Sequence, residues 1–140
     1  MNKKIKALNK IILISAVIFT GILSGCSNIN NSAEVKKVNF SNITAEEAKK
    51  RLDSEKGIIL IDVRTKEEYD TGHIKGSILI PVDNLKEEAP KNLKDTKTVI
   101  FVYCKSGNRS KTAANILGDM GYEKVYNLGG IINWPYEITK

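Results

Sequence analysis

Two apolar runs stand out in the pattern of hydrophobic and polar positions along the chain. GIILIDV at residues 57–63 and TVIFVY at residues 98–103 are rich in Ile and Val and hold few polar residues. Runs of this length and composition are typical of strands that are covered on both faces of a sheet. Shorter apolar runs predict three further strands, at residues 38–40, 78–80 and 124–128.

The segments between these runs carry helix signals. Thr44 and Glu47 have the spacing of a capping box at the head of ITAEEAKKRLD. A second helix is predicted in SKTAANILGDMGY, which Gly121 closes at the C-terminal position that glycine favours. Its apolar stripe consists of Ala113, Ala114, Leu117 and Met120. Strands that alternate with helices in this way predict a doubly wound α/β domain, with a mainly parallel central sheet flanked by helices.

The first 26 residues have the pattern of a targeting segment. A lysine-rich start leads into an apolar run at residues 11–23, which is shorter than the ~20 apolar residues that a membrane-spanning helix needs. LSGC at residues 23–26 resembles the lipobox of bacterial lipoproteins. The resemblance implies that residues 1–25 are a lipoprotein signal peptide and that Cys26 carries the lipid. An uncleaved anchor helix is the alternative.

Residues 26–37 are polar and rich in Asn and Ser, which predicts a flexible tether before a folded domain at residues 38–140. A lipid on Cys26 would anchor that domain to the extracytoplasmic face of a bacterial membrane. The net charge is +6, but four of these charges lie in the first ten residues, where no acid is present. The remainder mixes both signs, which argues against a nucleic-acid partner.

The candidate chemistry lies in YCKSGNRS, where Cys104 ends an apolar run and a helix is about to begin. In doubly wound sheets the ligand crevice lies outside the carboxyl ends of the strands. The free N–H groups and the dipole of a helix start favour an anion, and Lys105 and Arg109 add positive charge. Gly107 allows the loop to turn its N–H groups inward. These conditions lower the pKa of a thiol and make it nucleophilic.

The alternative is an inert cysteine packed against the sheet. The residues that follow Cys104 are polar, charged or glycine, which is poor material for a core. We therefore expect a catalytic side chain that lies near the surface.

CKSGNRS resembles the active loop of single-domain rhodanese-family sulfurtransferases. Further blocks that are similar to that family stand in the same order: DVRTKEEYDTGHIKGSILIP at residues 62–81, VIFVYCKSGNRS at 99–110 and NLGGIINW at 127–134. The resemblance covers about residues 38–140. It implies a rhodanese-like fold and an enzyme that takes sulfane sulfur from a small anionic donor such as thiosulfate. Cys104 would hold the sulfur as a persulfide, with no other cofactor, and pass it to a thiol or protein acceptor.

The resemblance also implies roles for the loop. Main-chain N–H groups would surround the outer sulfur, the hydroxyls of Ser106 and Ser110 could donate to it, and Lys105 would meet the donor at the rim. The implied substrate-binding residues are Lys105, Ser106, Gly107, Asn108, Arg109 and Ser110.

Three other polar residues near these motifs are interpreted as structural. Asp62 and Arg64 follow a buried strand, and we expect a carboxylate–guanidinium tie between neighbouring loops. His73 could be a base, but a thiolate that dipoles already stabilise needs none. No metal is expected, because the single His and the Cys of the domain lie in different motifs.

The same residues are also compatible with other functions. A sulfur carrier would deliver the persulfide of Cys104 to a dedicated partner protein, and a phosphatase or arsenate reductase would use the loop for an oxyanion. Thiol–disulfide exchange is disfavoured, since Cys104 has no nearby resolving cysteine. Four residues separate Cys104 from Arg109, one fewer than in the related oxyanion enzymes of this fold. A tighter loop suits a single sulfur atom better than a tetrahedral oxyanion.

Overall fold

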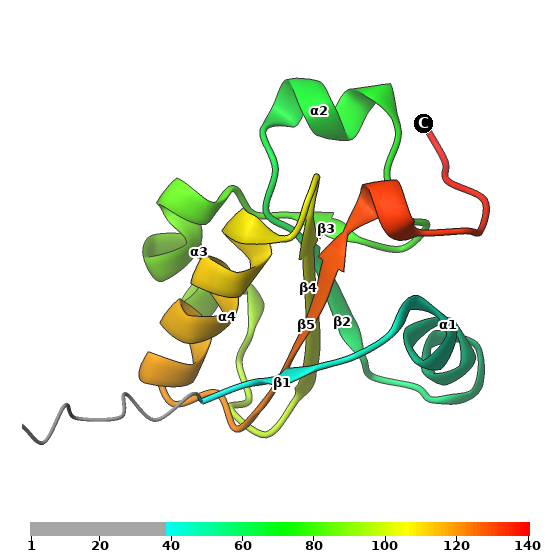
Figure 1. Ribbon diagram of the computed structural model, residues 1–140. Helices are drawn as coiled ribbons and strands as arrows, with labels where there is room; N and C mark the ends of the chain where they lie inside the picture. Colours follow the sequence, from blue (N-terminus) through cyan, green and yellow to red (C-terminus); the bar gives the residue numbers. More distant parts are fainter. Residues whose placement is uncertain (1–38) are drawn as a thin grey trace, which may run out of the picture. The chain divides into compact units, whose positions relative to one another are not determined.

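The computed structural model of the protein describes residues 39–140, and these form a single sheet with helices on both faces (Figure 1). All of its strands pair in parallel. In spatial order the five strands are β1 (Ser41–Asn42), β5 (Lys124–Gly130), β4 (Val99–Cys104), β2 (Ile59–Asp62) and β3 (Ile78–Leu79). The predicted doubly wound α/β domain is confirmed.

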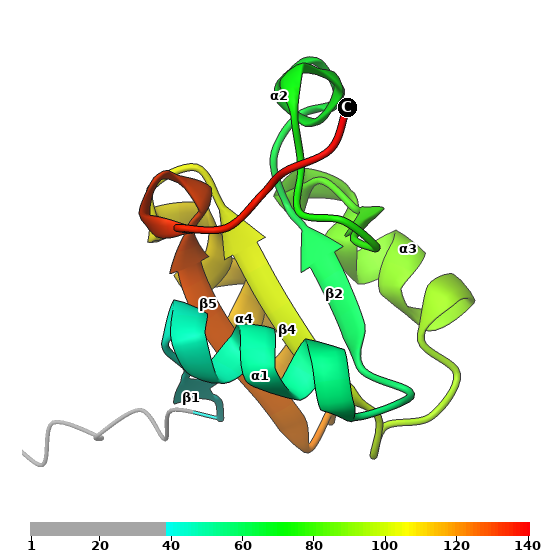
Figure 2. The ribbon, with the colours of Figure 1, turned by 90° about the vertical axis from the view of Figure 1, so that its right-hand side faces the viewer.

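The helices divide between the two faces of the sheet. Helix α1 (Ala45–Ser54) covers one face, and α3 (Leu85–Asn92) and α4 (Asn108–Asp119) cover the other (Figures 1 and 2). The short helix α2 (Lys66–Thr71) lies beyond the carboxyl ends of the strands. Two 3₁₀ turns complete the fold, η1 (Val82–Asn84) and η2 (Ile131–Asn133).

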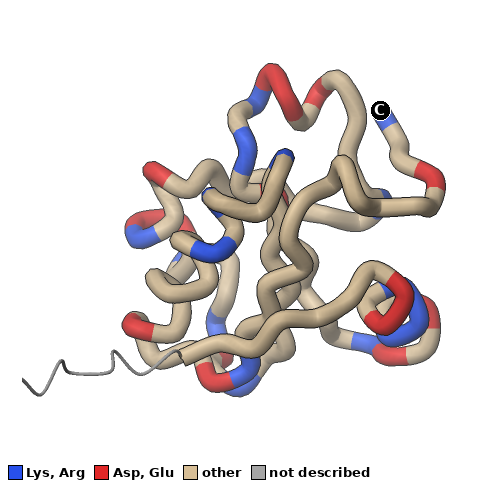
Figure 3. The backbone as a smooth tube through the Cα atoms, in the orientation of Figure 1, with Lys and Arg blue, Asp and Glu red and all other residues tan. Residues whose placement is uncertain are grey.

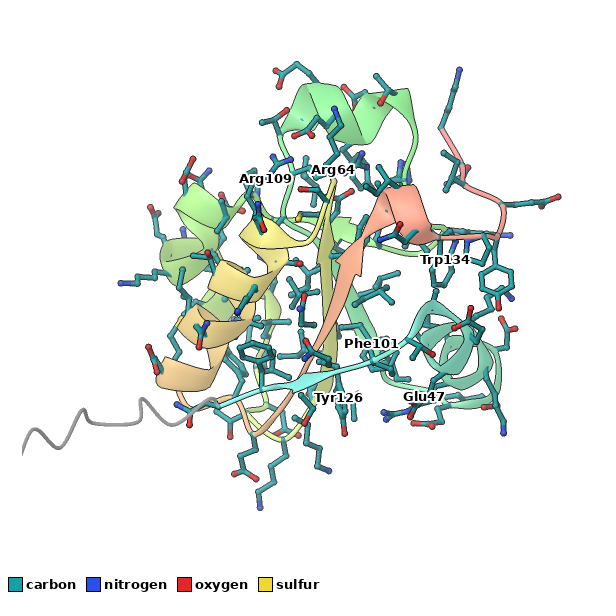
Figure 4. All side chains as sticks on the ribbon, viewed as in Figure 1. Glu47, Arg64, Phe101, Arg109, Tyr126 and Trp134 are labelled. Carbon is teal, nitrogen blue, oxygen red and sulfur yellow. The ribbon has the colours of Figure 1, made fainter. Side chains whose placement is uncertain are left out.

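The central strand β4 explains why its sequence is apolar without interruption. Its alternate residues Ile100, Val102 and Cys104 pack in the cluster that contains α3 and α4. Phe101 and Tyr103 pack in the cluster on the α1 face, together with Trp134 (Figure 4). Side chains of a strand alternate between faces, so a strand buried on both faces has no polar position. Cys104 is thereby the last side chain that β4 turns toward α4.

The first strand lies later than predicted. An apolar run suggested residues 38–40, whereas β1 consists of Ser41 and Asn42. These pair with Tyr126 and Asn127 of β5, and Asn127 Nδ2 donates a hydrogen bond of 3.0 Å to Asn42 Oδ1. Phe40 instead packs against the core with part of its side chain buried. The partner strand, and not apolarity, decides where this edge strand forms.

Side-chain caps begin two of the helices. The Thr44 hydroxyl accepts a hydrogen bond from the N–H of Glu47, as the sequence spacing predicted. At α2 the capping box is complete, since Thr65 accepts from the Glu68 N–H and Glu68 accepts from the Thr65 N–H. This second box is also present in the sequence, and it places Glu68 at the site described below.

The expected signal peptide at residues 1–25, Cys26 and the tether to residue 37 lie outside the described residues. Among residues 39–140, no helix has the length and apolarity needed to cross a membrane.

Along this part of the chain, Lys and Arg are interspersed with Asp and Glu over the helices and loops (Figure 3).

Candidate active site

The candidate nucleophile, Cys104, sits where β4 ends and a short loop leads into α4. Its thiol is free, and its Sγ accepts a hydrogen bond of 3.1 Å from the N–H of Gly107. Gly107 has φ +107°, a left-handed conformation that glycine adopts without strain, and α4 begins at the next residue. The turn at Gly107 therefore brings the start of α4 back over the sulfur.

The pKa of the Cys104 thiol is lowered from its ordinary value, although two effects oppose each other. Burial raises the pKa, and hydrogen bonds from the N–H groups of Ser110, Gly107 and Ser106 and from the Ser110 hydroxyl lower it by more. The first N–H groups of a helix have no intrahelical partner, so they are available to the sulfur. The loop thus favours a thiolate at a buried position.

The Ser110 hydroxyl has only one proton for several acceptors. Its Oγ lies 2.9 Å from Gly107 O and 3.1 Å from Gly129 O, and donates to these carbonyls. Help from this hydroxyl to the sulfur competes with those two bonds, whereas a backbone N–H has no such competition. We therefore attribute the lowered pKa of Cys104 mainly to the N–H groups.

The depth of Cys104 corrects one prediction. A surface-near side chain was expected, but Cys104 is 1% exposed. The alternation of β4 turns its side chain under the loop instead of outward. The sulfur therefore lies beneath the loop and not at its exposed rim.

The other predicted site residues form the loop and the first turn of α4 that directly follow Cys104. Lys105, Ser106 and Asn108 are exposed, Gly107 and Arg109 are half-buried, and Ser110 is buried. The exposed residues form the rim, and Lys105 contributes a positive charge there.

Arg109 closes the loop through an ion pair that the sequence did not indicate. Its Nη1 and Nη2 donate to Glu68 Oε2 and Oε1 at 2.6 and 2.8 Å, while Oε2 also accepts from the Thr65 N–H at 3.1 Å. The hydrogen bonds from Arg109 are the main cause that lowers the pKa of Glu68 to about 2; burial opposes them, and the bond from Thr65 adds to them. Glu68 thus joins the start of α2 to the end of the active loop.

Asp62 and Arg64 form a buried pair beneath α2. The guanidinium donates to both Asp62 oxygens at 2.7–3.0 Å, and Nη2 also donates to Gly72 O at 2.7 Å. Asp62 and Arg64 are 0% and 5% exposed. Figure 4 shows Arg64 and Arg109 at the same end of the sheet. These contacts connect the end of β2 to the turn after α2, in keeping with a structural role.

His73 lies in that turn and is occupied by local contacts. Its ring stacks on Tyr69 with centroids 3.7 Å apart, and Nδ1 is 3.1 Å from Tyr69 O. Its backbone pairs with Thr139 through two hydrogen bonds of 2.8 Å. His73 therefore holds the C-terminal segment against the turn. Within residues 39–140, no three His, Cys, Asp or Glu side chains are grouped so as to hold a metal ion.

The model of the Rhodanese-like domain family matches residues 44–136. The chain belongs to this family.

Relatives of this rhodanese-like domain include two kinds of sulfur-handling protein. It is 41% identical over 71 residues to the thiosulfate sulfurtransferase PspE of Escherichia coli, covering 51% of this chain and 68% of that protein. It is 34% identical over 93 residues to the putative sulfur carrier protein YrkF of Bacillus subtilis, covering 66% of this chain and 49% of that one. The chain therefore spans about half the length of this second relative.

Solved structures agree with the fold. A rhodanese with anions from E. coli superposes with a TM-score of 0.57 at 36% identity, over 59% of this chain and 98% of that chain. A protein from Anabaena sp. superposes with a TM-score of 0.65 at 29% identity, over 69% and 90%.

Asp62→Ala should destabilise the domain by about 3–5 kcal/mol, because it leaves the buried Arg64 charge without its carboxylate. Urea unfolding at pH 7 measures the loss. Lys66→Ala is the matched control, since its pair with Asp70 is exposed and should add little stability. An Asp62 variant as stable as the Lys66 variant would contradict the structural role.

Glu68→Gln should lower stability in a pH-dependent way. The folded-state pKa of Glu68 is about 2 and its ordinary value is 4.5, so the wild-type advantage should be complete above pH 4.5 and lost as the pH falls toward 2. Urea unfolding of both proteins between neutral and acidic pH measures this difference. Glu46→Gln, an exposed glutamate of α1, controls for removal of a negative charge. A wild-type advantage that does not change with pH would rule out the ion pair as its source.

Proposed function

We propose that this rhodanese-like domain is a sulfurtransferase that moves sulfane sulfur from thiosulfate or a persulfide donor to a thiol or protein acceptor. The observation that carries the proposal is the buried Cys104 sulfur of lowered pKa, which accepts hydrogen bonds from the N–H groups of its own loop. Family membership and the sulfurtransferase relative support it.

The proposed first step is attack of the Cys104 thiolate on the outer sulfur of thiosulfate. The sulfur–sulfur bond of the donor breaks, sulfite leaves with the bonding electron pair, and a Cys104 persulfide anion remains. The negative charge moves from Sγ to the outer sulfur during this step. N–H groups that already point at the site can stabilise the moving charge without reorganisation. Lys105 at the rim favours an anionic donor.

In the second step an acceptor thiolate attacks the outer sulfur. The persulfide bond breaks, the acceptor leaves with the sulfur, and the Cys104 thiolate is regenerated. No external oxidant or reductant is needed, because each step exchanges one sulfur–sulfur bond for another. With cyanide as acceptor the product would be thiocyanate.

A carrier function is the second candidate, and the relative named as a putative sulfur carrier favours it. A carrier would load sulfur on Cys104 once but turn over slowly with small acceptors. An oxyanion enzyme is less favoured, since only four residues separate Cys104 from Arg109, and so short a loop suits a single sulfur atom better than a tetrahedral oxyanion.

Wild-type protein incubated with thiosulfate should gain the mass of one sulfur atom, and cyanide should remove it as thiocyanate. Cys104→Ala should keep its circular dichroism spectrum and lose both the added mass and thiocyanate formation, because the nucleophile is gone. Intact-mass spectrometry and a thiocyanate assay measure these outcomes, with Cys26→Ala as the cysteine control.

Three other results would change the proposal. Loading without turnover would favour the carrier. Retained transfer in Cys104→Ala would refute the assigned nucleophile. Hydrolysis of aryl phosphates that depends on Cys104 would replace sulfur transfer by phosphatase chemistry.

We further propose that residues 1–25 are a lipoprotein signal peptide and that Cys26 carries the lipid, so that the domain is held at the extracytoplasmic membrane face. The support is the lipobox-like LSGC after a lysine-rich start and an apolar run.

Bacterial cells that express the protein with a labelled fatty acid should incorporate the label into wild type and Cys104→Ala, but not into Cys26→Ala. The label is read after denaturing electrophoresis. Wild-type protein without label would refute the lipid anchor and leave the proposed chemistry of the domain untouched.

A further inference from the structure

Gly130, the last residue of β5, is a glycine that its backbone conformation does not require. Its φ of −108° and ψ of 136° are extended values that any residue adopts. A side chain at this position is excluded by steric overlap. A Cβ on Gly130 would lie 2.6 Å from Lys105 O, 2.7 Å from Ser106 Cα and 2.8 Å from Ser106 C. All three atoms belong to the backbone of the active loop, so no side-chain rotation could relieve the contact.

The backbone that packs against Gly130 leads directly to the N–H that donates to the nucleophile. Its carbonyl, Lys105 O, accepts a hydrogen bond of 3.3 Å from the N–H of Ile132 in η2. This bond fixes the Lys105–Ser106 peptide against η2. Ser106 C, the third atom that would meet the Gly130 Cβ, belongs to the next peptide, whose Gly107 N–H donates the 3.1 Å hydrogen bond to Cys104 Sγ.

A β-bulge in β5 brings Gly130 to this position. Val102 of β4 pairs with Asn127 but Tyr103 pairs with Gly129, so Leu128 is an extra residue in β5. Gly129 has φ +87°, and its N–H donates 3.1 Å to Asn127 Oδ1. The bulge sets the register in which Gly130 lies opposite Cys104.

We propose that Gly130 is a positioning residue for Cys104. Because Gly130 has no side chain, the backbone of Lys105 and Ser106 can pack against β5 in the position from which the Gly107 N–H donates to the sulfur. Gly130 thus acts on the reactivity of the thiol through the loop, without touching substrate. The part of this inference that concerns turnover rests on the proposed sulfur transfer, and the part that concerns the thiol does not.

Gly130→Ala tests the proposal. The added methyl should displace the Lys105–Ser106 peptide, so the midpoint of the pH profile for alkylation of Cys104 by iodoacetamide should move to higher pH. Sulfur transfer from thiosulfate should fall by about tenfold or more, because deleting a single preorganised donor typically costs at least that much. Circular dichroism and urea unfolding report whether the variant folds.

Gly118→Ala is the matched control. Gly118 lies in α4, and its added Cβ would meet Asn39, with Asn39 O at 2.8 Å. The substitution and the crowding are of the same kind, but the contact is with the segment before β1 and not with the active loop. Gly118→Ala should lose stability while its alkylation midpoint stays that of the wild type.

The outcomes separate the possibilities. A wild-type midpoint in Gly130→Ala, or an equal shift in both variants, would overturn the positioning role. If Gly130→Ala does not fold, NMR of the wild-type protein tests the inference instead. The Gly107 amide resonance should titrate together with Cys104, and an amide that does not respond overturns the inference. A wild type that transfers no sulfur, beside a shifted midpoint in Gly130→Ala, would refute the proposed function alone.

Discussion

The active site of this domain depends on the hydrogen bonds from backbone N–H groups to the Cys104 sulfur. Burial under the loop favours the neutral thiol, and the N–H groups at the head of α4 overcome that preference. A strand that ends where a helix begins supplies both conditions. The strand carries the side chain inward, and the first turn of the helix has N–H groups without intrahelical partners. Fixed dipoles thus give a buried thiolate part of the stabilisation that water would otherwise supply.

Fixed dipoles require a fixed loop, and contacts from several elements hold it. Glu68 at the start of α2 pairs with Arg109, and Ile132 of η2 donates to Lys105 O. Ser110 Oγ connects the head of α4 to the carbonyl of Gly129 in β5. The buried Asp62–Arg64 pair secures α2 in turn, through the carbonyl of Gly72. The elements that surround the carboxyl end of β4 thus act together as a support for one short loop.

Much of the fold could be predicted because its signals are local or periodic. The apolar runs that became β2 and β4 follow from burial on both faces, and Thr44 marked the start of α1. Predictions failed where contact with a distant segment determines the local structure. The first strand formed at Ser41–Asn42, two polar residues, because pairing with β5 selects them. The depth of Cys104 was also misjudged, since polar loop residues suggested a surface while the alternation of β4 placed the sulfur beneath them.

The sequence by itself determined the composition of the active loop, because Cys104 through Ser110 are consecutive and α4 begins among them. Only the tertiary structure decided what holds that loop. Glu68 lies 41 residues from Arg109, and its local signal, the capping box with Thr65, carries no information about that partner. Gly130 looks like an ordinary turn glycine until its contact with the Lys105–Ser106 peptide is seen. Parallel strands bring their carboxyl ends to one edge of the sheet, and contacts at that edge join segments that no local pattern connects.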